Sequence, residues 1–340
     1  MAWLSTLRTM HRGVWLRAGM LIVLWGMQLG GILNACEPPS SVCIVVGASG
    51  ESDYGTMFHE WGNRWLKSAE GLSPVWIGEE RVKGLEQAGQ KPADRDQLRQ
   101  WIESVESVEK TGTCWLVLLG HGTYDGKEAK FNLRGADVSS QELGNWLKGS
   151  KHRWVIAVCA SSSGPFLGAL AGHDRVVITA TKSGSETNFS RFGGFFAESI
   201  RELASDLDHD ESISVLEAFV AASRKTERYY QEQNLLATEH PMIDDNGDGK
   251  GTSAEFYRGL RPIKRSEKGV VDGELARHIW LMEPEETKSL TESDRIKVQQ
   301  IEKEIEALRE RKSTMLEEAY YSDLEKLLLE LARVLYPSSK

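Results

Sequence analysis

At 340 residues, the chain is long enough for about two domains of ordinary size. Its apolar share of 40% and its charged share of 27% are those of an ordinary globular protein. The formal net charge of −9 argues against binding to nucleic acids or to anionic membranes, because such proteins normally carry a basic face. Small molecules, peptides and other proteins remain as partners.

The first 36 residues have the pattern of an export signal. Arg8, Arg12 and Arg17 make the start basic, and residues 18–35 then run without a charge. A basic start, an apolar region and a small-residue exit are typical of a secretory signal, which we exclude from the fold.

Three versions of this export signal stay open. "LNAC", residues 33–36, resembles a bacterial lipoprotein signal, in which Cys36 becomes the lipidated first residue. A cleaved signal without lipid is the second version. An uncleaved membrane anchor is the third, because the apolar segment reaches the lower limit for a membrane-spanning helix. We expect an exported protein of the cell envelope, anchored to the membrane as a lipoprotein and facing the periplasm or the exterior.

Three cysteines follow position 36, so at least one of them has no partner in the chain. Cys43 and Cys114 begin apolar runs, which predicts two buried small side chains, although a bridge between them stays open. Cys159 instead ends an apolar run.

Short apolar runs alternate with helical patterns between residues 42 and about 245. The runs are 42–47, 74–78, 115–120, 154–159 and 175–181. They are apolar almost throughout, which is typical of strands in a sheet covered on both faces. Helical patterns lie at 57–71, from Asp94 onward, and at 139–149, where Ser139 or Ser140 is the candidate cap. This alternation predicts an α/β fold with a mostly parallel sheet and helices on both faces.

The chain changes character from about Leu290. Apolar residues recur at three- and four-residue steps in 298–308 and again in 324–334. This pattern predicts two long helices that form a hairpin, packed on itself or on the sheet, and this region is a candidate for partner binding. We therefore expect an α/β domain over 37–262 and a helical region over 263–340.

Two reactive side chains lie at strand ends. His121 stands between two glycines after the run 115–120, and Cys159 ends the run 154–159. Ligands of open α/β sheets bind beyond the carboxyl ends of the strands, so both residues are expected on one rim. A thiolate and an imidazole form the minimal pair for acyl transfer. Each residue alone is more often structural, but together on one rim they favour catalysis.

The residues after Cys159 are all small: Ala160, Ser161, Ser162, Ser163 and Gly164. Small residues after a nucleophile let a substrate carbonyl approach and leave backbone N–H groups to stabilise an oxyanion.

"LLGHG" and "VIAVCASSSG", with residues 131–147 between them, resemble the legumain-type cysteine peptidases, relatives of caspases, gingipains and the catalytic subunit of the GPI transamidase. The resemblance covers about 42–257 and implies a caspase-like fold. It implies that Cys159 is the nucleophile and His121 the general base or acid. The backbone N–H groups of Gly122 and Cys159 would form the oxyanion hole. The family needs no third triad member and no cofactor, and it cleaves proteins or peptides.

The chain departs from that family around the specificity pocket. Ala157 stands where legumains have an acidic residue, and residues 47–55 offer no arginine. The legumain preference for asparagine is therefore not implied. We expect the tip after the first strand and the loop 181–194 to line the pocket, with these polar contacts: Ser49, Lys182, Ser183, Glu186 and Arg191.

Three alternatives to a cysteine endopeptidase stay open. A transpeptidase or transamidase would use the same acyl-enzyme but pass it to an amine. A non-catalytic envelope protein would keep the fold and bind a partner through its C-terminal helices. A serine hydrolase using a residue of 161–163 is the weakest alternative, because no acid–histidine partner pattern supports it.

Residues 244–255 fit the calcium-binding loop of an EF-hand at every specified position. The expected ligands are the side chains of Asp244, Asn246, Asp248 and Glu255 and the carbonyl of Lys250. Gly251 stands where an apolar residue normally packs, and a second paired loop is missing. We expect one weak calcium site of the extracellular type, against the alternative of a solvated acidic turn.

Overall fold

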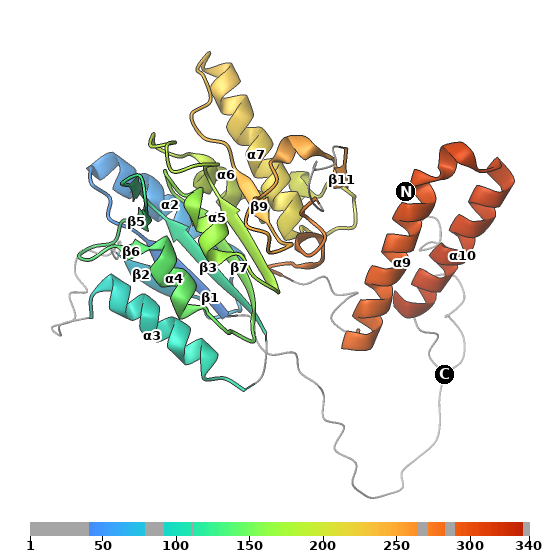
Figure 1. Cartoon of the computed structure of the whole chain (residues 1–340), viewed down its shortest axis with the longest axis horizontal. Coiled ribbons are helices and arrows are strands. Elements are labelled where there is room, and N and C mark those ends of the chain that lie inside the picture. The colour runs from blue at the N-terminus through green and yellow to red at the C-terminus, as the bar shows by residue number, and fades with distance from the viewer. Residues whose placement is uncertain (1–40, 79–91, 110–111, 264–270, 283–289, 336–340) are drawn as a thin grey trace, which may run out of the picture. The chain divides into compact units, whose positions relative to one another are not determined.

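The apolar runs form the strands of one central sheet. The structure, a computed structural model, describes residues 41–78, 92–109, 112–263, 271–282 and 290–335. Six strands stand in the order β2-β1-β3-β7-β8-β9 (Figure 1). They are β1 Ser41–Val46, β2 Val75–Gly78, β3 Thr113–Leu119, β7 Arg153–Cys159, β8 Arg175–Thr179 and β9 Met242–Asp244. All pairs are parallel except β8 with β9. The predicted α/β fold with a mostly parallel sheet is confirmed.

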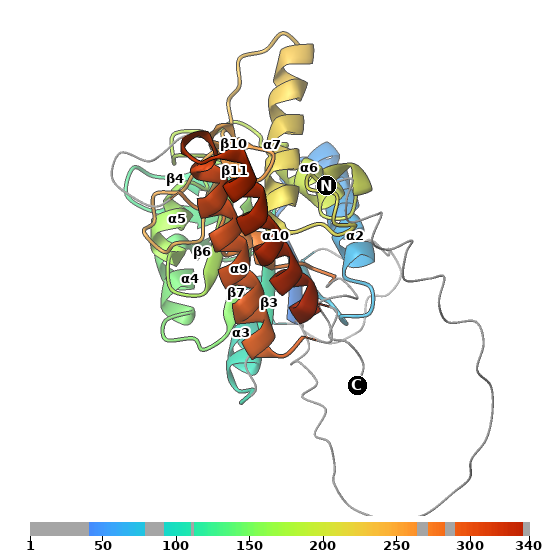
Figure 2. The ribbon, with the colours of Figure 1, turned by 90° about the vertical axis from the view of Figure 1, so that its right-hand side faces the viewer.

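Helices cover both faces of this sheet, which is why its strands are apolar throughout (Figures 1 and 2). On β3, Trp115 and Val117 join one apolar cluster, while Leu116 and Leu118 join another on the opposite face. The first cluster includes residues of α2 Ser52–Ser68, α6 Phe192–Ser199 and α7 Val215–Glu232. The second includes residues of α3 Asp94–Glu106, α4 Ser140–Trp146 and α5 Pro165–Leu170.

Local signals place the helix starts. Ser139 is the cap of α4, and its Oγ accepts a hydrogen bond of 3.2 Å from the backbone N–H of Glu142. Helix α2 begins at Ser52, five positions before the predicted start at residue 57. Residues 52–56 are polar and show no helical repeat of apolar residues. Asp53 in the first turn nevertheless favours a helix start there, because its charge interacts favourably with the helix dipole.

A small antiparallel sheet lies at the carboxyl ends of β1 and β3. Its strands are β4 Gly122–Tyr124, β5 Ala129–Phe131 and β6 Val138–Ser139. The ring of Phe131 lies so close to Gly47 and Gly120, which follow β1 and β3, that a Cβ on either glycine would be 3.0 Å from it. This contact fixes the small antiparallel sheet over the ends of β1 and β3.

The C-terminal region forms two helices, as predicted: α9 Glu292–Glu310 and α10 Glu317–Leu335, which lie side by side (Figures 1 and 2). Ile301, Ile305 and Leu308 of the first apolar stripe are buried, whereas Leu328 of the second is exposed. Residues Pro38–Lys340 group as one unit by their internal contacts, and the domain boundary near residue 262 stays a prediction. The short remaining elements are η1 Leu203–Ser205, η2 Ala254–Phe256, β10 Tyr257–Arg258, β11 Arg261–Pro262, η3 Ala276–His278 and η4 Lys312–Thr314.

The N-terminal segment 1–36, with Cys36, lies outside the described residues, and the export signal stays a prediction. Among the helices that the structure describes, none combines the length and the apolar character needed to cross a membrane. Cys43 and Cys114 are buried and both carry free thiols. The interpretation of these two as small buried side chains is confirmed.

Candidate functional site

His121 lies at the rim of the sheet, two residues beyond the last residue of β3. Aromatic rings surround the imidazole: the ring centroids of Tyr54 and Phe58 on α2 are each 5.0 Å away, and that of Phe189 is 6.0 Å away. All three pairs meet edge to face, the arrangement that aromatic rings prefer. This packing fixes the plane of the imidazole.

A backbone carbonyl fixes the proton on the imidazole. Nε2 of His121 lies 3.2 Å from the carbonyl oxygen of Ser49, which only accepts hydrogen bonds, so Nε2 carries the proton. Nδ1 is then the basic nitrogen. Burial lowers the pKa of His121 from its ordinary value, against the opposing effects of the Ser49 hydrogen bond and the Glu51 charge. His121 is therefore a neutral base at neutral pH.

Cys159 lies inside the core rather than on the rim. It pairs with Leu119 in the parallel ladder, and its side chain belongs to the cluster beneath α2 and α6. Only 1% of Cys159 is exposed, and a Cβ added to Gly193 would lie 2.7 Å from the Cβ of Cys159. Burial strongly raises the pKa of the thiol, and the Glu239 charge adds to this. The thiol is buried in this structure, and a buried thiol is less reactive than an exposed thiolate, so the role of Cys159 as the nucleophile stays a prediction.

The turn after β7 brings a different side chain to His121's neighbourhood. The Oγ of Ser161 accepts a hydrogen bond of 3.2 Å from the N–H of Gly122 and donates one of 3.1 Å to the Gly122 carbonyl. Gly122 is the residue after His121. A Cβ on it would lie 2.2 Å from the carbonyl oxygen of Ser161, so only glycine fits. The predicted oxyanion donor at Gly122 thus faces Ser161.

The predicted pocket residues lie on segments that touch this turn. Ser49 holds the imidazole, as described above. The carbonyl of Glu186 accepts a 2.8 Å hydrogen bond from the N–H of Ser162. The carboxylate of Glu186 accepts from the N–H of Lys182 at 3.0 Å and pairs with Nδ1 of His240. Ser183 forms hydrogen bonds within the same loop. The structure therefore places Lys182, Ser183 and Glu186 on a segment that contacts the turn after β7, whereas Ser49 contacts His121.

Arg191 of the predicted pocket has an aromatic environment. Its guanidinium lies 4.5 Å from the ring centroid of Tyr229 and 5.4 Å from that of Phe189, which also contacts His121. This is cation–π geometry.

Glu239 anchors the loop that carries Arg191, a role that no sequence motif predicts. The residue is 2% exposed. Its carboxylate accepts hydrogen bonds from Ser190 Oγ at 2.6 Å, from the N–H groups of Arg191 and Phe192 at 2.9 and 3.1 Å, and from the Tyr230 hydroxyl at 3.1 Å. It satisfies the free N–H groups at the start of α6. Burial raises the pKa of Glu239, and these donors oppose that effect.

The loop 244–255 forms the predicted turn without gathering its carboxylates. Asp244 accepts hydrogen bonds from the N–H groups of Gly247, at 2.8 Å, and Gly249. Gly249 has φ +74°, as the sharp turn of a calcium loop requires. Among the described residues, however, the carboxylates of Asp244, Asp248 and Glu255 do not all come within 4.8 Å of one another. Asn246 and Lys250 take part in hydrogen bonds of the same turn.

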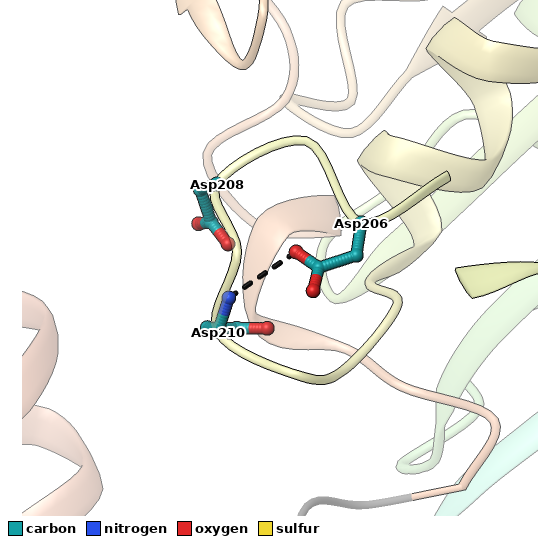
Figure 3. Close-up of side chains that lie close together, drawn as sticks. All are labelled: Asp206, Asp208 and Asp210. Carbon is teal, nitrogen blue, oxygen red and sulfur yellow. Dashed lines mark hydrogen bonds between the residues drawn. The ribbon is translucent and has the colours of Figure 1, made fainter. Parts of the chain in front are cut away.

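One cluster of carboxylates does assemble elsewhere. Ligand atoms of Asp206, Asp208 and Asp210 lie within 4.8 Å of one another (Figure 3). Asp206 accepts hydrogen bonds from the N–H groups of His209 at 2.6 Å and Asp210 at 3.2 Å, so it braces its own loop. Burial and the two neighbouring carboxylates raise the pKa of Asp208 to about 6. Sequence reasoning did not single out this cluster.

No protein-family model matches the chain, and a search of curated proteins finds no similar sequence.

The contact between Gly193 and Cys159 predicts the effect of one added methyl group. Gly193→Ala should lower the free energy of unfolding by about 1–3 kcal/mol, because the new Cβ meets Cys159 and the ring of Trp61. Gly168→Ala on α5 is the matched control, since the nearest atom to its Cβ is 3.9 Å away. We expect the control to gain about 0.5–1 kcal/mol. Urea unfolding of both variants measures these free energies. Equal free energies of unfolding in Gly193→Ala and Gly168→Ala would show that Gly193 is not tightly packed against Cys159.

Calcium binding at 244–255 predicts a ligand-dependent melting temperature. At ten times its Kd, calcium would stabilise the folded chain by about 1.4 kcal/mol. We expect Tm to be higher in calcium than in chelator, and the difference to disappear in Asp244→Asn. Magnesium serves as the control cation, because it demands a stricter geometry. Equal melting temperatures with calcium and with chelator would show that the loop is only an acidic turn.

Proposed function

We propose that the chain is an acyl-transfer hydrolase that cleaves peptide bonds at the rim formed by the carboxyl ends of β3 and β7. The observation that carries this proposal is His121, whose Nε2 is 3.2 Å from the Ser49 carbonyl while Nδ1 is left as a base. The residue next to this base, Gly122, carries an N–H that is hydrogen-bonded to the Ser161 hydroxyl. The resemblance to legumain-type peptidases supplies the substrate class, a protein or peptide.

In this proposal, each residue of the rim has its own chemical role. His121 takes the proton from the nucleophile and returns it to the leaving amine. The N–H of Gly122 faces the reacting centre and stabilises the oxyanion. Residues 182–191, which touch the turn after β7, contact the substrate side chains. For Cys159 to act here, its side chain would have to leave the core.

The setting proposed for this reaction is the cell envelope. The export signal in residues 1–36 and lipidation at Cys36 remain proposals, as does partner binding through α9 and α10. Transfer of the acyl group to an amine instead of water is the nearest alternative, because it uses the same intermediate.

One observation favours a second candidate function. The burial of Cys159, the family's expected nucleophile, fits a peptidase fold that binds peptides without cleaving them. Such a protein would retain peptides on the same rim with no turnover, and the two candidates differ in whether His121 is needed.

The role of His121 predicts a loss of activity and a pH profile. His121→Ala should lower kcat/KM for peptide cleavage by about 10²–10⁴-fold, the usual share of proton transfer. In the wild type, kcat/KM should fall as the pH decreases, because the protonated imidazole is no base. The midpoint should lie below 6.5, since burial lowers the pKa of His121 from that value.

These experiments use a fluorogenic peptide library with the chain from Glu37 onward. His173→Ala is the control, because the His173 side chain is 95% exposed. Cleavage that survives in His121→Ala at the wild-type rate would exclude this proposal.

A further inference from the structure

The register of β3 and β7 determines which residue stands opposite His121. The two strands are parallel, and Leu119 pairs with Cys159. Each is the last residue of its strand. Counting two residues onward on both strands leads to His121 and Ser161. The ladder ends at Leu119 and Cys159, so His121 and Ser161 stand at equal distances along the chain beyond it, and Cys159 lies two residues before Ser161.

Hydrogen bonds place the Ser161 hydroxyl in the same region. Its Oγ lies 3.2 Å from the nitrogen and 3.1 Å from the oxygen of Gly122, the residue covalently next to His121. Both residues are buried, Ser161 at 4% and Cys159 at 1% exposure, so their positions in the chain distinguish them. Ser161 lies two residues beyond the end of β7 and contacts Gly122, whereas Cys159 is the last residue of β7 and belongs to the apolar cluster of α2 and α6.

The backbone directly after Ser161 is strained. Ser162 has φ +55°, in the left-handed region that costs a residue with a side chain roughly 1–2 kcal/mol. Its N–H is held by the Glu186 carbonyl at 2.8 Å, while its buried Oγ has no hydrogen-bond partner. The Oγ of Ser163 is also fixed, 3.2 Å from Thr181 Oγ1. Strain of this kind concentrates at functional sites, and here it turns the chain directly after Ser161.

Backbone donors around Ser161 suit an oxyanion. Within the described part of the chain, the N–H of Ser161 donates no hydrogen bond, and the N–H of Gly122 donates to Ser161 Oγ. Once that Oγ is acylated, the Gly122 N–H becomes free. Two N–H groups then flank the carbon that is bonded to Oγ, as an oxyanion hole requires.

We propose that Ser161 and His121 form the nucleophile–base pair of this site, an inference that rests on the proposed hydrolase function. The Ser161 Oγ attacks the carbonyl carbon of the scissile peptide bond, and its proton passes to Nδ1 of His121. His121 then gives that proton to the leaving amine as the C–N bond breaks, which leaves an ester on Ser161. Water attacks the ester, its proton passes through His121 back to Ser161 Oγ, and the carboxylic acid product leaves.

Peptide cleavage by three variants tests the assignment. Ser161→Ala should lower kcat by at least about 10³-fold, as removal of a nucleophile does. Cys159→Ala should keep the wild-type kcat, with thermal melting used to show that it is folded at the assay temperature. Ser162→Ala is the matched control, because it removes the neighbouring hydroxyl, which makes no hydrogen bond, and it should also keep kcat. Activity that survives in Ser161→Ala and disappears in Cys159→Ala would overturn the pair while leaving the hydrolase intact.

A second readout needs no substrate. S161C replaces the hydroxyl with a thiol, whose alkylation by iodoacetamide is followed against pH by mass spectrometry. Beside His121 this thiol should titrate below the ordinary cysteine value of about 8.5. The added H121A substitution should return it to the ordinary range, while the buried Cys43, Cys114 and Cys159 stay unmodified.

The two readouts separate the two proposals. Unchanged alkylation on adding H121A would overturn the Ser161–His121 pair. A histidine-dependent thiol in a chain whose wild type cleaves no peptide would support the pair and exclude the hydrolase.

Discussion

The parallel pairing of β3 with β7 is the constraint on which the site depends. Because Leu119 and Cys159 stand opposite each other at the last ladder position, the residues beyond them arrive on the rim together. His121 and Ser161 are those residues. Gly122 then joins the two segments through its N–H and carbonyl, both hydrogen-bonded to the Ser161 hydroxyl. The chemistry proposed here follows from this register and from the absence of a side chain at Gly122.

One aromatic layer serves both the core and the site. Phe58 and Trp61 of α2 are packed together, with ring centroids 5.5 Å apart. Phe58 also orients the imidazole of His121, while Trp61 and Gly193 close over Cys159. The packing that makes Cys159 inaccessible therefore also fixes the base. This arrangement explains how a cysteine at a strand end can be a core residue while the proposed nucleophile lies two residues later.

The sequence predicted the five parallel strands, the cap at Ser139 and the position of His121 at a strand end, because apolar runs, capping residues and glycines are local signals. It could not predict which face Cys159 takes. Strands buried on both sides show no alternation of polar and apolar residues, so the side chain's direction is invisible until the register is known. For the same reason the sequence offered Ser161 only among the three serines of the weakest alternative, because its partner Gly122 is 39 positions away. Glu239 was missed because its four donors come from distant or backbone groups. The calcium motif at 244–255 folds into the predicted turn, and calcium binding there stays a prediction.

The site of reaction with a fluorophosphonate probe, which phosphonylates an activated serine with loss of fluoride, tests the Ser161–His121 pair directly. We expect one adduct, mapped by peptide mass spectrometry to Ser161, whose formation slows as the pH falls below the pKa of His121. An adduct on another serine, or an intact wild-type chain that forms none at any pH, would contradict it. The result separates a serine activated by His121 from a rim that only binds peptides.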